Sequence, residues 1–259
     1  MHLAVLAYEG ISPFMLSTPL AVFGEPFLAG GHRVEVCSAT PRFAAGALTV
    51  EAPSPLRAAD AADVVILPGW RNADERVAPE IVAVLRAAHA RGALVVGLCL
   101  GAFGLAEAGL LDGRRATTHW ARAAAFAARY PRVAVDPGAL FIDEGPVLTS
   151  AGLAAGLDCC LHLLGRLSGL GEANRVARHL VVAPQRAGAQ PQWIERPALG
   201  PSADRRVSAI LETLRADPLA PAPLDELALR ILLEVEVRCV ALFTGDVGGH
   251  VVGRVADGP

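Results

Sequence analysis

The segment 97–101 (GLCLG) carries the residue with the clearest chemical potential, Cys99. An apolar run precedes it and a helical pattern follows, which is the layout of a nucleophile elbow with cysteine in place of serine. The flanking glycines allow a tight turn, and the helix N-terminus after it offers backbone N–H groups that favour a thiolate and can hold an oxyanion. Two interpretations stay open at this point: a reactive nucleophile, and a buried cysteine in a glycine-rich turn.

His119 is the second candidate, because it stands in the segment 117–120 (TTHW) just before a predicted helix. A Cys–His pair is the smallest arrangement that activates a thiol. A single histidine at a helix start, however, more often serves as a structural hydrogen-bonding group. Gly69, in the segment 67–70 (LPGW) at the end of a predicted strand, allows a backbone N–H to approach a ligand closely. A plain strand-to-helix turn explains that segment equally well.

The elements that position these residues follow from the apolar pattern. Continuous apolar runs at 2–8, 34–37, 63–67 and 93–98 are typical of parallel strands covered on both faces. Helices are predicted to begin at Ser12-Pro13, at Pro79 and after His119, and strands alternating with helices indicate a doubly wound α/β fold. Ligands bind such sheets at the carboxyl ends of the strands. Residues 8–11, 69–70 and 99–100 all lie at such ends, so we expect one shared cleft.

The remaining chain is less regular. Residues 133–150 are predicted to form a short β excursion, followed by helices over 153–164 and 173–180. Residues 183–202 are rich in proline and glycine, which indicates a linker or surface arm. Residues 203–215 have the spacing of an amphipathic helix.

Composition sets limits on function. The 259 residues are 53% hydrophobic and carry a net charge of −3, with 23 arginines and no lysine, so there is no general attraction to nucleic acid or anionic membranes. No apolar stretch reaches the roughly 18 residues that would suggest a membrane span, and no secretory signal is apparent. The five cysteines form no C-x-x-C pair and no metal-ligand spacing, so we expect reduced thiols, a cytoplasmic location, and neither a metal nor a cofactor.

The elbow, the LPGW turn and the run 102–120 together resemble the ThiJ/PfpI family of the class I glutamine amidotransferase-like superfamily. Segments 12–14, 148–152 and 173–178 are most similar to the sensor domains of AraC-type transcriptional regulators. The resemblance implies a flavodoxin-like sandwich, usually dimeric, with Cys99 and His119 as the site pair and a small-molecule effector. It also implies that Gly69 and Leu100 supply backbone N–H groups as oxyanion donors. We further expect Met15, Trp70 and Trp120 to line the pocket, where the two tryptophans suggest a small, partly apolar ligand.

Two departures from the family pattern weaken the expectation of catalysis and of DNA binding. Met15 occupies the position where the family has an acidic residue, which removes a general acid or base, and neither Glu9 nor Glu25 is placed to substitute. Residues 203–230 resemble the opening of a helix-turn-helix region, but the resemblance stops after Arg230. Residues 184–259 hold 8 Arg against 10 Asp plus Glu, a net of −2, which is unfavourable for DNA.

These observations predict three parts: a ThiJ/PfpI-like sensor domain at 1–183, a linker at 184–202, and an incomplete helix-turn-helix region with an anomalous tail at 203–259. Such a tail is expected of a truncated or frame-shifted regulator. The favoured function is a small-molecule-sensing regulator of AraC type that is not an enzyme. One alternative is a stand-alone cysteine-dependent enzyme, such as an isonitrile-hydratase-like lyase or a hydrolase. The other is a dimeric ligand-binding protein in which Cys99 is inherited geometry. Met15 favours the first and the last.

Overall fold

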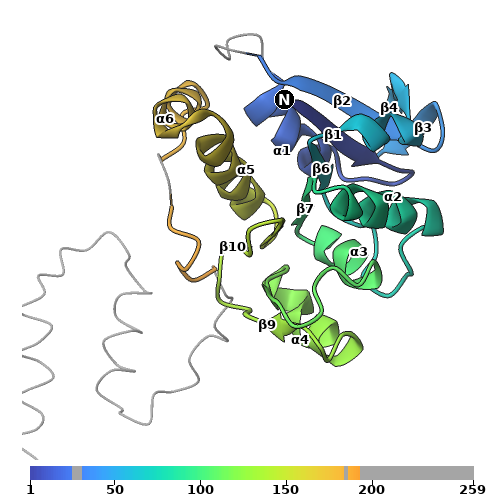
Figure 1. Cartoon of the computed structure of the whole chain (residues 1–259), viewed down its shortest axis with the longest axis vertical. Helices are drawn as coiled ribbons and strands as arrows, with labels where there is room; N and C mark the ends of the chain where they lie inside the picture. The colour runs from blue at the N-terminus through green and yellow to red at the C-terminus, as the bar shows by residue number, and fades with distance from the viewer. Residues whose placement is uncertain (25–30, 184–185, 193–259) are drawn as a thin grey trace, which may run out of the picture. The chain divides into compact units, whose positions relative to one another are not determined.

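The four apolar runs predicted as strands form the centre of a seven-stranded sheet in the computed structural model (Figure 1). The structure describes residues 1–24, 31–183 and 186–192, which belong to one compact unit, Met1–Ile194. The predictions for residues 203–259, for most of the linker and for Glu25 fall outside the described residues. The sheet has the order β10-β11-β7-β6-β1-β2-β5 and is parallel except for β10. Its strands are β1 (His2–Ala7), β2 (Arg33–Ser38), β5 (Ser54–Pro55), β6 (Val64–Leu67), β7 (Leu94–Leu98), β10 (Phe141–Asp143) and β11 (Val147–Ser150).

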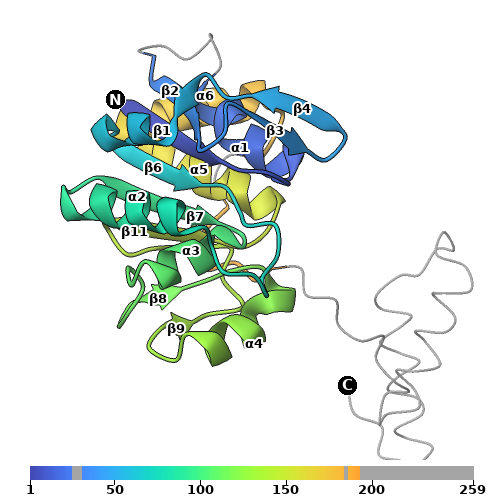
Figure 2. The same cartoon turned by 90° about the vertical axis from the view of Figure 1, so that its right-hand side faces the viewer.

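Helices cover both faces of this sheet, which confirms the doubly wound α/β prediction. One face packs against α1 (Pro13–Phe23), α5 (Ala154–Ser168) and α6 (Leu170–His179). The other face packs against α2 (Pro79–Ala90), α3 (Gly101–Glu107) and a short 3-10 helix, η1 (Leu56–Ala61), as Figures 1 and 2 show from two directions. Across the described ranges, no helix is both long and apolar enough to cross a bilayer.

Three smaller elements complete the unit. Helix α4 (Trp120–Arg129) packs with a parallel pair, β8 (Arg115–Ala116) and β9 (Ala134–Val135). A hairpin of β3 (Arg42–Ala45) and β4 (Leu48–Glu51) lies outside the main sheet.

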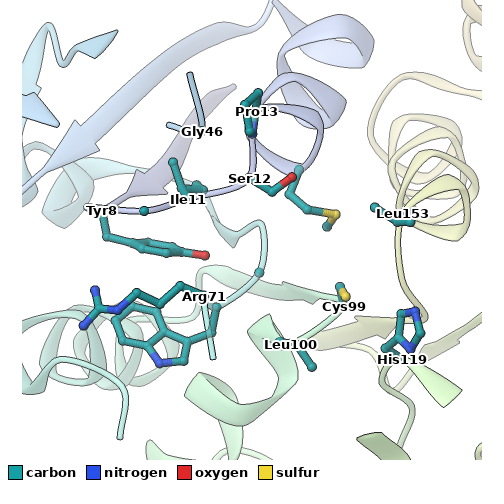
Figure 3. Close-up of a pocket in the computed structure, with 14 residues that line it drawn as sticks. Tyr8, Ile11, Ser12, Pro13, Gly46, Arg71, Cys99, Leu100, His119 and Leu153 are labelled. Atoms are coloured by element: carbon teal, nitrogen blue, oxygen red, sulfur yellow. The ribbon is translucent and has the colours of Figure 1, made fainter. Parts of the chain in front are cut away.

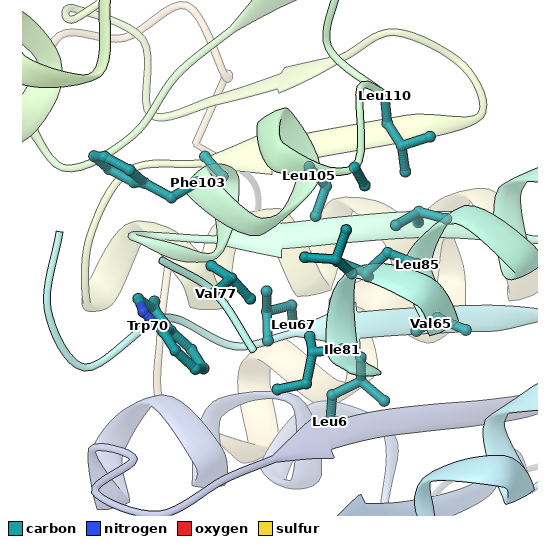
Figure 4. Close-up of a cluster of buried hydrophobic side chains, with 14 of the residues drawn as sticks. Leu6, Val65, Leu67, Trp70, Val77, Ile81, Leu85, Phe103, Leu105 and Leu110 are labelled. Atoms are coloured by element: carbon teal, nitrogen blue, oxygen red, sulfur yellow. The ribbon is translucent and has the colours of Figure 1, made fainter. Parts of the chain in front are cut away.

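The continuous apolar runs are explained by the two-sided core. Along β6, Val65 and Leu67 join the cluster beneath α2 and α3, whereas Val64 and Ile66 join the cluster beneath α1 and α5. All four side chains have no exposed surface, so neither face of the strand tolerates a polar residue. Figure 4 shows the first cluster, in which Val65 and Leu67 lie with residues of α2 and α3.

Two parts of the sequence prediction are wrong in detail. Strand β11 is not part of a separate β excursion, because it pairs in parallel with β7 inside the main sheet. The β3–β4 hairpin was not predicted at all; its turn at Gly46 uses a left-handed backbone with φ +57°. The strands involved, β3, β4 and β11, are only four residues each, too short for local periodicity to reveal how they pair.

The strand order fixes where a ligand can enter. Strand β1 has β2 as its neighbour on one side and β6 on the other, so the strand order reverses direction at β1, as in flavodoxin-like sheets. The loops after β1 and β6 therefore diverge, and a crevice opens between their carboxyl ends.

Candidate functional site

A cavity of about 460 Å³ lies at this crevice (Figure 3). Most of its walls come from the segments that follow four strands of the sheet, β1, β6, β7 and β11, and the rest come from the β3–β4 turn and the segment between β8 and α4. The lining residues are Tyr8, Gly10, Ile11, Ser12, Pro13, Met15, Gly46, Gly69, Trp70, Arg71, Cys99, Leu100, His119 and Leu153.

The turn between β7 and α3 explains the glycines of the GLCLG segment. Cys99 has a left-handed backbone with φ 53°. A Cβ on Gly97 would stand 2.9 Å from the backbone carbon of Gly101, and one on Gly101 would stand 2.2 Å from the carbonyl oxygen of Leu67. Since real Cβ contacts are longer, both positions require glycine for the backbone to pass so closely. The elbow is thus held between β7 and the end of β6.

The sulfur of Cys99 lies in a mostly buried environment. Burial raises the pKa of the thiol, and the backbone N–H groups of Leu100 and Leu153 lower it in part. The expected effect of the helix N-terminus is therefore present, but desolvation outweighs it. The direction of this pKa shift is opposite to the one that would stabilise a thiolate.

His119 caps helix α4 with its ring. Its Nδ1 accepts a hydrogen bond of 3.2 Å from the backbone N–H of Ala121, so Nδ1 carries no proton. Burial, followed by the charge of Arg122, lowers the pKa of the imidazole. The neutral ring then carries its proton on Nε2 and offers a donor instead of a base.

The side chains of Cys99 and His119 both lie against Gly152. A Cβ on Gly152 would stand 2.3 Å from His119 Cδ2 and 3.2 Å from Cys99 Sγ. Among the described residues, however, no hydrogen bond joins the sulfur to the ring. The two residues are neighbours, but they do not form the activated pair that nucleophilic catalysis requires.

Met15, the residue predicted to replace an acidic group, lines the cavity. Its side chain is buried at 4% exposure, and its Cβ and Cγ lie within 3.8 Å of the point where a Cβ of Gly69 would stand. The fourteen residues that line the cavity include no Asp and no Glu. The carboxylate of Glu9 accepts the backbone N–H of Ala44 and is not part of the lining.

An aromatic wall closes the side of the cavity opposite Cys99. The rings of Tyr8 and Trp70 lie 4.6 Å apart, and the guanidinium of Arg71 covers the Trp70 ring at 4.8 Å. Arg71 is in turn bound to Glu75 at 2.7 Å, so its charge is largely balanced. Burial raises the pKa of Tyr8, which keeps the phenol neutral, and Figure 3 shows its hydroxyl directed into the cavity.

Six of the seven predicted site residues meet at this cavity. They are Met15, Gly69, Trp70, Cys99, Leu100 and His119. Trp120 does not; it lines an adjoining space of about 280 Å³ together with His119, Leu153 and Gln192. Arg71 and Leu153 were not anticipated, because neither has a residue type or spacing that marks a site in the sequence.

Comparison with known proteins places the chain among relatives of several activities. Residues 1–166 match the model of the DJ-1/PfpI family. The HTH-type transcriptional regulator CdhR of Pseudomonas aeruginosa is 31% identical over 207 residues, which cover 79% of this chain and 61% of that protein. The isonitrile hydratase of Pseudomonas putida is 32% identical over 128 residues, covering 47% of this chain and 53% of the enzyme.

Among solved structures, an AraC family transcriptional regulator from Pseudomonas putida superposes with a TM-score of 0.61 and 24% identity. The match covers 69% of this chain and 98% of that one, and it shows the shared fold. The chain spans between half and two thirds of the length of these two curated relatives. The ThiJ/PfpI resemblance is thereby confirmed: the chain belongs to the DJ-1/PfpI family.

Proposed function

We propose that residues 1–192 form the small-molecule-sensing domain of an AraC-type transcriptional regulator. The observation that carries the proposal is the geometry of the site: Cys99 and His119 are neighbours that share no hydrogen bond among the described residues, and the cavity lining contains Met15 but no Asp or Glu. Such a site offers shape and neutral hydrogen-bond donors but no activated nucleophile. The alignment with a transcriptional regulator over 79% of the chain supports the same reading.

The lining predicts the kind of effector. Apolar surface from Ile11, Met15 and Leu153 surrounds the hydroxyl of Tyr8 and the thiol of Cys99. Burying a full charge here without a partner would be costly. A small, partly apolar molecule with one or two hydrogen-bonding groups therefore fits best.

Binding without turnover is the direct test of this function. The full chain is screened by thermal shift against small neutral and zwitterionic metabolites, and each hit is then incubated with the protein and analysed by mass spectrometry. We expect a hit at 100 times its Kd to stabilise the protein by about 2.7 kcal/mol and to be recovered unchanged. Conversion of a hit by the wild type, abolished in Cys99→Ser, would contradict the proposal.

The second candidate is a cysteine-dependent isonitrile hydratase, favoured by the 32% identity to the enzyme of that name. The reaction would add water across an isonitrile to give the N-substituted formamide. An alkyl isonitrile incubated with the full chain distinguishes the two functions. We expect no formamide above the rate of a Cys99→Ser control, and formamide formed only by the wild type would establish the enzyme.

DNA binding and dimer formation are further proposals. Because residues 184–259 carry a net charge of −2, we expect only non-specific DNA binding in the range of about 10⁻⁴ to 10⁻⁶ M. Salt-resistant nanomolar binding to one sequence in a gel-shift assay would overturn this expectation. A dimer is expected from the family resemblance, and light scattering of the purified chain measures it.

A further inference from the structure

Two side chains of the segment 186–192, Arg186 and Gln192, attach it to elements that also contact Cys99. Its backbone is held as well, because Leu140 N–H donates to the Gly188 carbonyl at 2.7 Å and Gln192 N–H donates to the Gly138 carbonyl at 2.8 Å. This segment leads out of the described domain, since residues 193–259 follow it in the sequence. Most of it is exposed, but Gln192 is buried at 7% exposure. Because Gln192 is buried while its neighbours are exposed, we regard it as the residue whose side chain attaches this end of the segment to the unit.

Gln192 makes four side-chain hydrogen bonds. Its Oε1 accepts the backbone N–H of Trp120 at 3.1 Å. The two hydrogens on its Nε2 are shared among three acceptors: Thr117 Oγ1 at 3.2 Å, the Thr118 carbonyl at 3.1 Å and the Ala139 carbonyl at 2.9 Å. Two carbonyl acceptors and one N–H donor fix the orientation of the amide, because only the NH₂ group can donate. We call Gln192 with these four partners the Gln192 clamp.

The inner side of the same loop faces the candidate site. The hydroxyl of Thr118 donates to the carbonyl oxygen of Cys99 at 2.9 Å, and His119, the next residue, lines the cavity with its ring. Two consecutive hydrogen bonds therefore connect Cys99 to Gln192 through Thr118. His119 lies between Thr118 and Trp120, whose backbone groups are hydrogen-bonded to Gln192, so a shift of His119 would strain these hydrogen bonds.

The second attachment point joins the segment to α5. Arg186 forms a bidentate pair with Asp158, whose side chain is 9% exposed. Asp158 lies in the second turn of α5, and the helix begins just after Leu153, whose N–H faces the Cys99 sulfur. Both anchors thus end on elements that meet at Cys99.

We propose that occupancy of the Cys99 cavity is transmitted to the rest of the chain through the Gln192 clamp. A ligand that displaces His119 shifts the Thr117–Trp120 loop and breaks hydrogen bonds of the clamp. Because Gln192 is buried, leaving part of its amide without hydrogen-bond partners is costly, so loss of one bond of the clamp weakens the attachment of the segment 186–192. This inference rests on the proposed sensing function and adds how the signal leaves the site.

Hydrogen exchange tests the clamp without an identified effector. The probe is iodoacetamide, which places a carbamidomethyl group on the Cys99 sulfur as iodide and the thiol proton leave. Cys239→Ser in the full chain removes the cysteine that lies outside the described residues, and Cys37, Cys159 and Cys160 are buried. We expect complete modification to increase the exchange rates of peptides covering 117–120 and 186–192 by about fivefold, the equivalent of about one hydrogen bond. Peptides from α2 serve as an internal reference.

Matched variants separate the clamp from general damage. Gln192→Glu keeps the shape but cannot donate to two carbonyl groups, so the unmodified variant is expected to show the raised exchange already. Gln190→Ala changes an exposed glutamine two residues away and is expected to behave as wild type.

Unchanged exchange at 186–192 in fully alkylated protein would overturn the clamp, as would normal exchange at 117–120 in Gln192→Glu. Isonitrile hydration would disprove the sensing function while leaving these exchange measurements valid.

Discussion

Two turns approach the Cys99 sulfur, and each places a non-glycine residue in the left-handed region. In the elbow this residue is Cys99 itself, with φ 53°; in the turn before α5 it is Leu153, with φ 51° and ψ −113°. Each turn precedes a helix and directs a backbone N–H toward the sulfur, from Leu100 in one case and from Leu153 in the other. The two turns nevertheless depend on different neighbours.

The elbow is enclosed by backbone, whereas the second turn is enclosed by site side chains. Gly101 is crowded by the Leu67 carbonyl, which the sheet holds in place. Gly152 is crowded by the ring of His119 and the sulfur of Cys99, and Leu153 leaves 51% of its own surface exposed. The conformation of the elbow is therefore fixed by the backbone of the sheet, whereas that of the second turn is fixed by the side chains of the site. The strained backbone of Leu153 is of the kind that often occurs at functional sites.

The largest expected effect comes from Gly101→Ala, which tests the backbone-enclosed turn. Its Cβ would meet the Leu67 carbonyl oxygen at 2.2 Å, so β6 and α3 must separate. We expect a loss of about 3 kcal/mol or more in the free energy of unfolding, measured by urea denaturation. Gly171→Ala is the control, because a Cβ at that helical position meets nothing within 4 Å and is expected to be neutral or stabilising. Equal losses in both variants would contradict the comparison.

Gly152→Ala tests the turn enclosed by the site. The His119 ring must move away from a Cβ that would stand 2.3 Å from Cδ2, at an expected cost of about 1 to 2 kcal/mol. In a His119→Ala background most of this cost should disappear, giving a coupling of about 1 kcal/mol in a double-mutant cycle. Additive losses would show that the ring is not what excludes a side chain at position 152.

Leu153→Gly is expected to have the smallest effect. Glycine relieves a backbone conformation that costs roughly 1 to 3 kcal/mol, but it also adds freedom to the unfolded chain. We expect a net change within about 1 kcal/mol in urea denaturation, with no loss of stability because the leucine side chain is half exposed. A destabilisation above about 2 kcal/mol would mean that Leu153 packs more than the described structure shows.

The elbow was predictable from the sequence, whereas the second turn was not, because only the elbow carries residue types that mark an unusual backbone. Glycines at positions 97 and 101, on either side of the cysteine, indicate that neighbouring backbone comes too close for a side chain. Leu153 gives no such signal, since its strain is imposed by the residues around it. The four central strands were predictable because burial on both faces leaves continuous apolar runs. The place of β11 in the main sheet depends on pairing with the distant strand β7, and the short β3–β4 hairpin has no continuous apolar run to mark it.

The segment 186–192 contains a buried contact that composition does not reveal. Proline and glycine predicted a linker from 184 onward, and the exposed residues fit that description. A glutamine gives no sign in the sequence that it is buried, because its partners at 117–120 and 139 are far along the chain. Trp120, expected at the ligand, instead contributes its backbone N–H to Gln192.

The central claim is that Cys99 is a neutral thiol in a binding pocket. The rate of its alkylation by iodoacetamide against pH, followed by peptide mass spectrometry, measures this most directly. The buried core thiols Cys159 and Cys160 serve as unreactive references. Because burial raises the pKa of Cys99, the thiolate fraction should rise only above the ordinary midpoint of about 8.5. A midpoint well below that value would show a stabilised thiolate and would contradict the account.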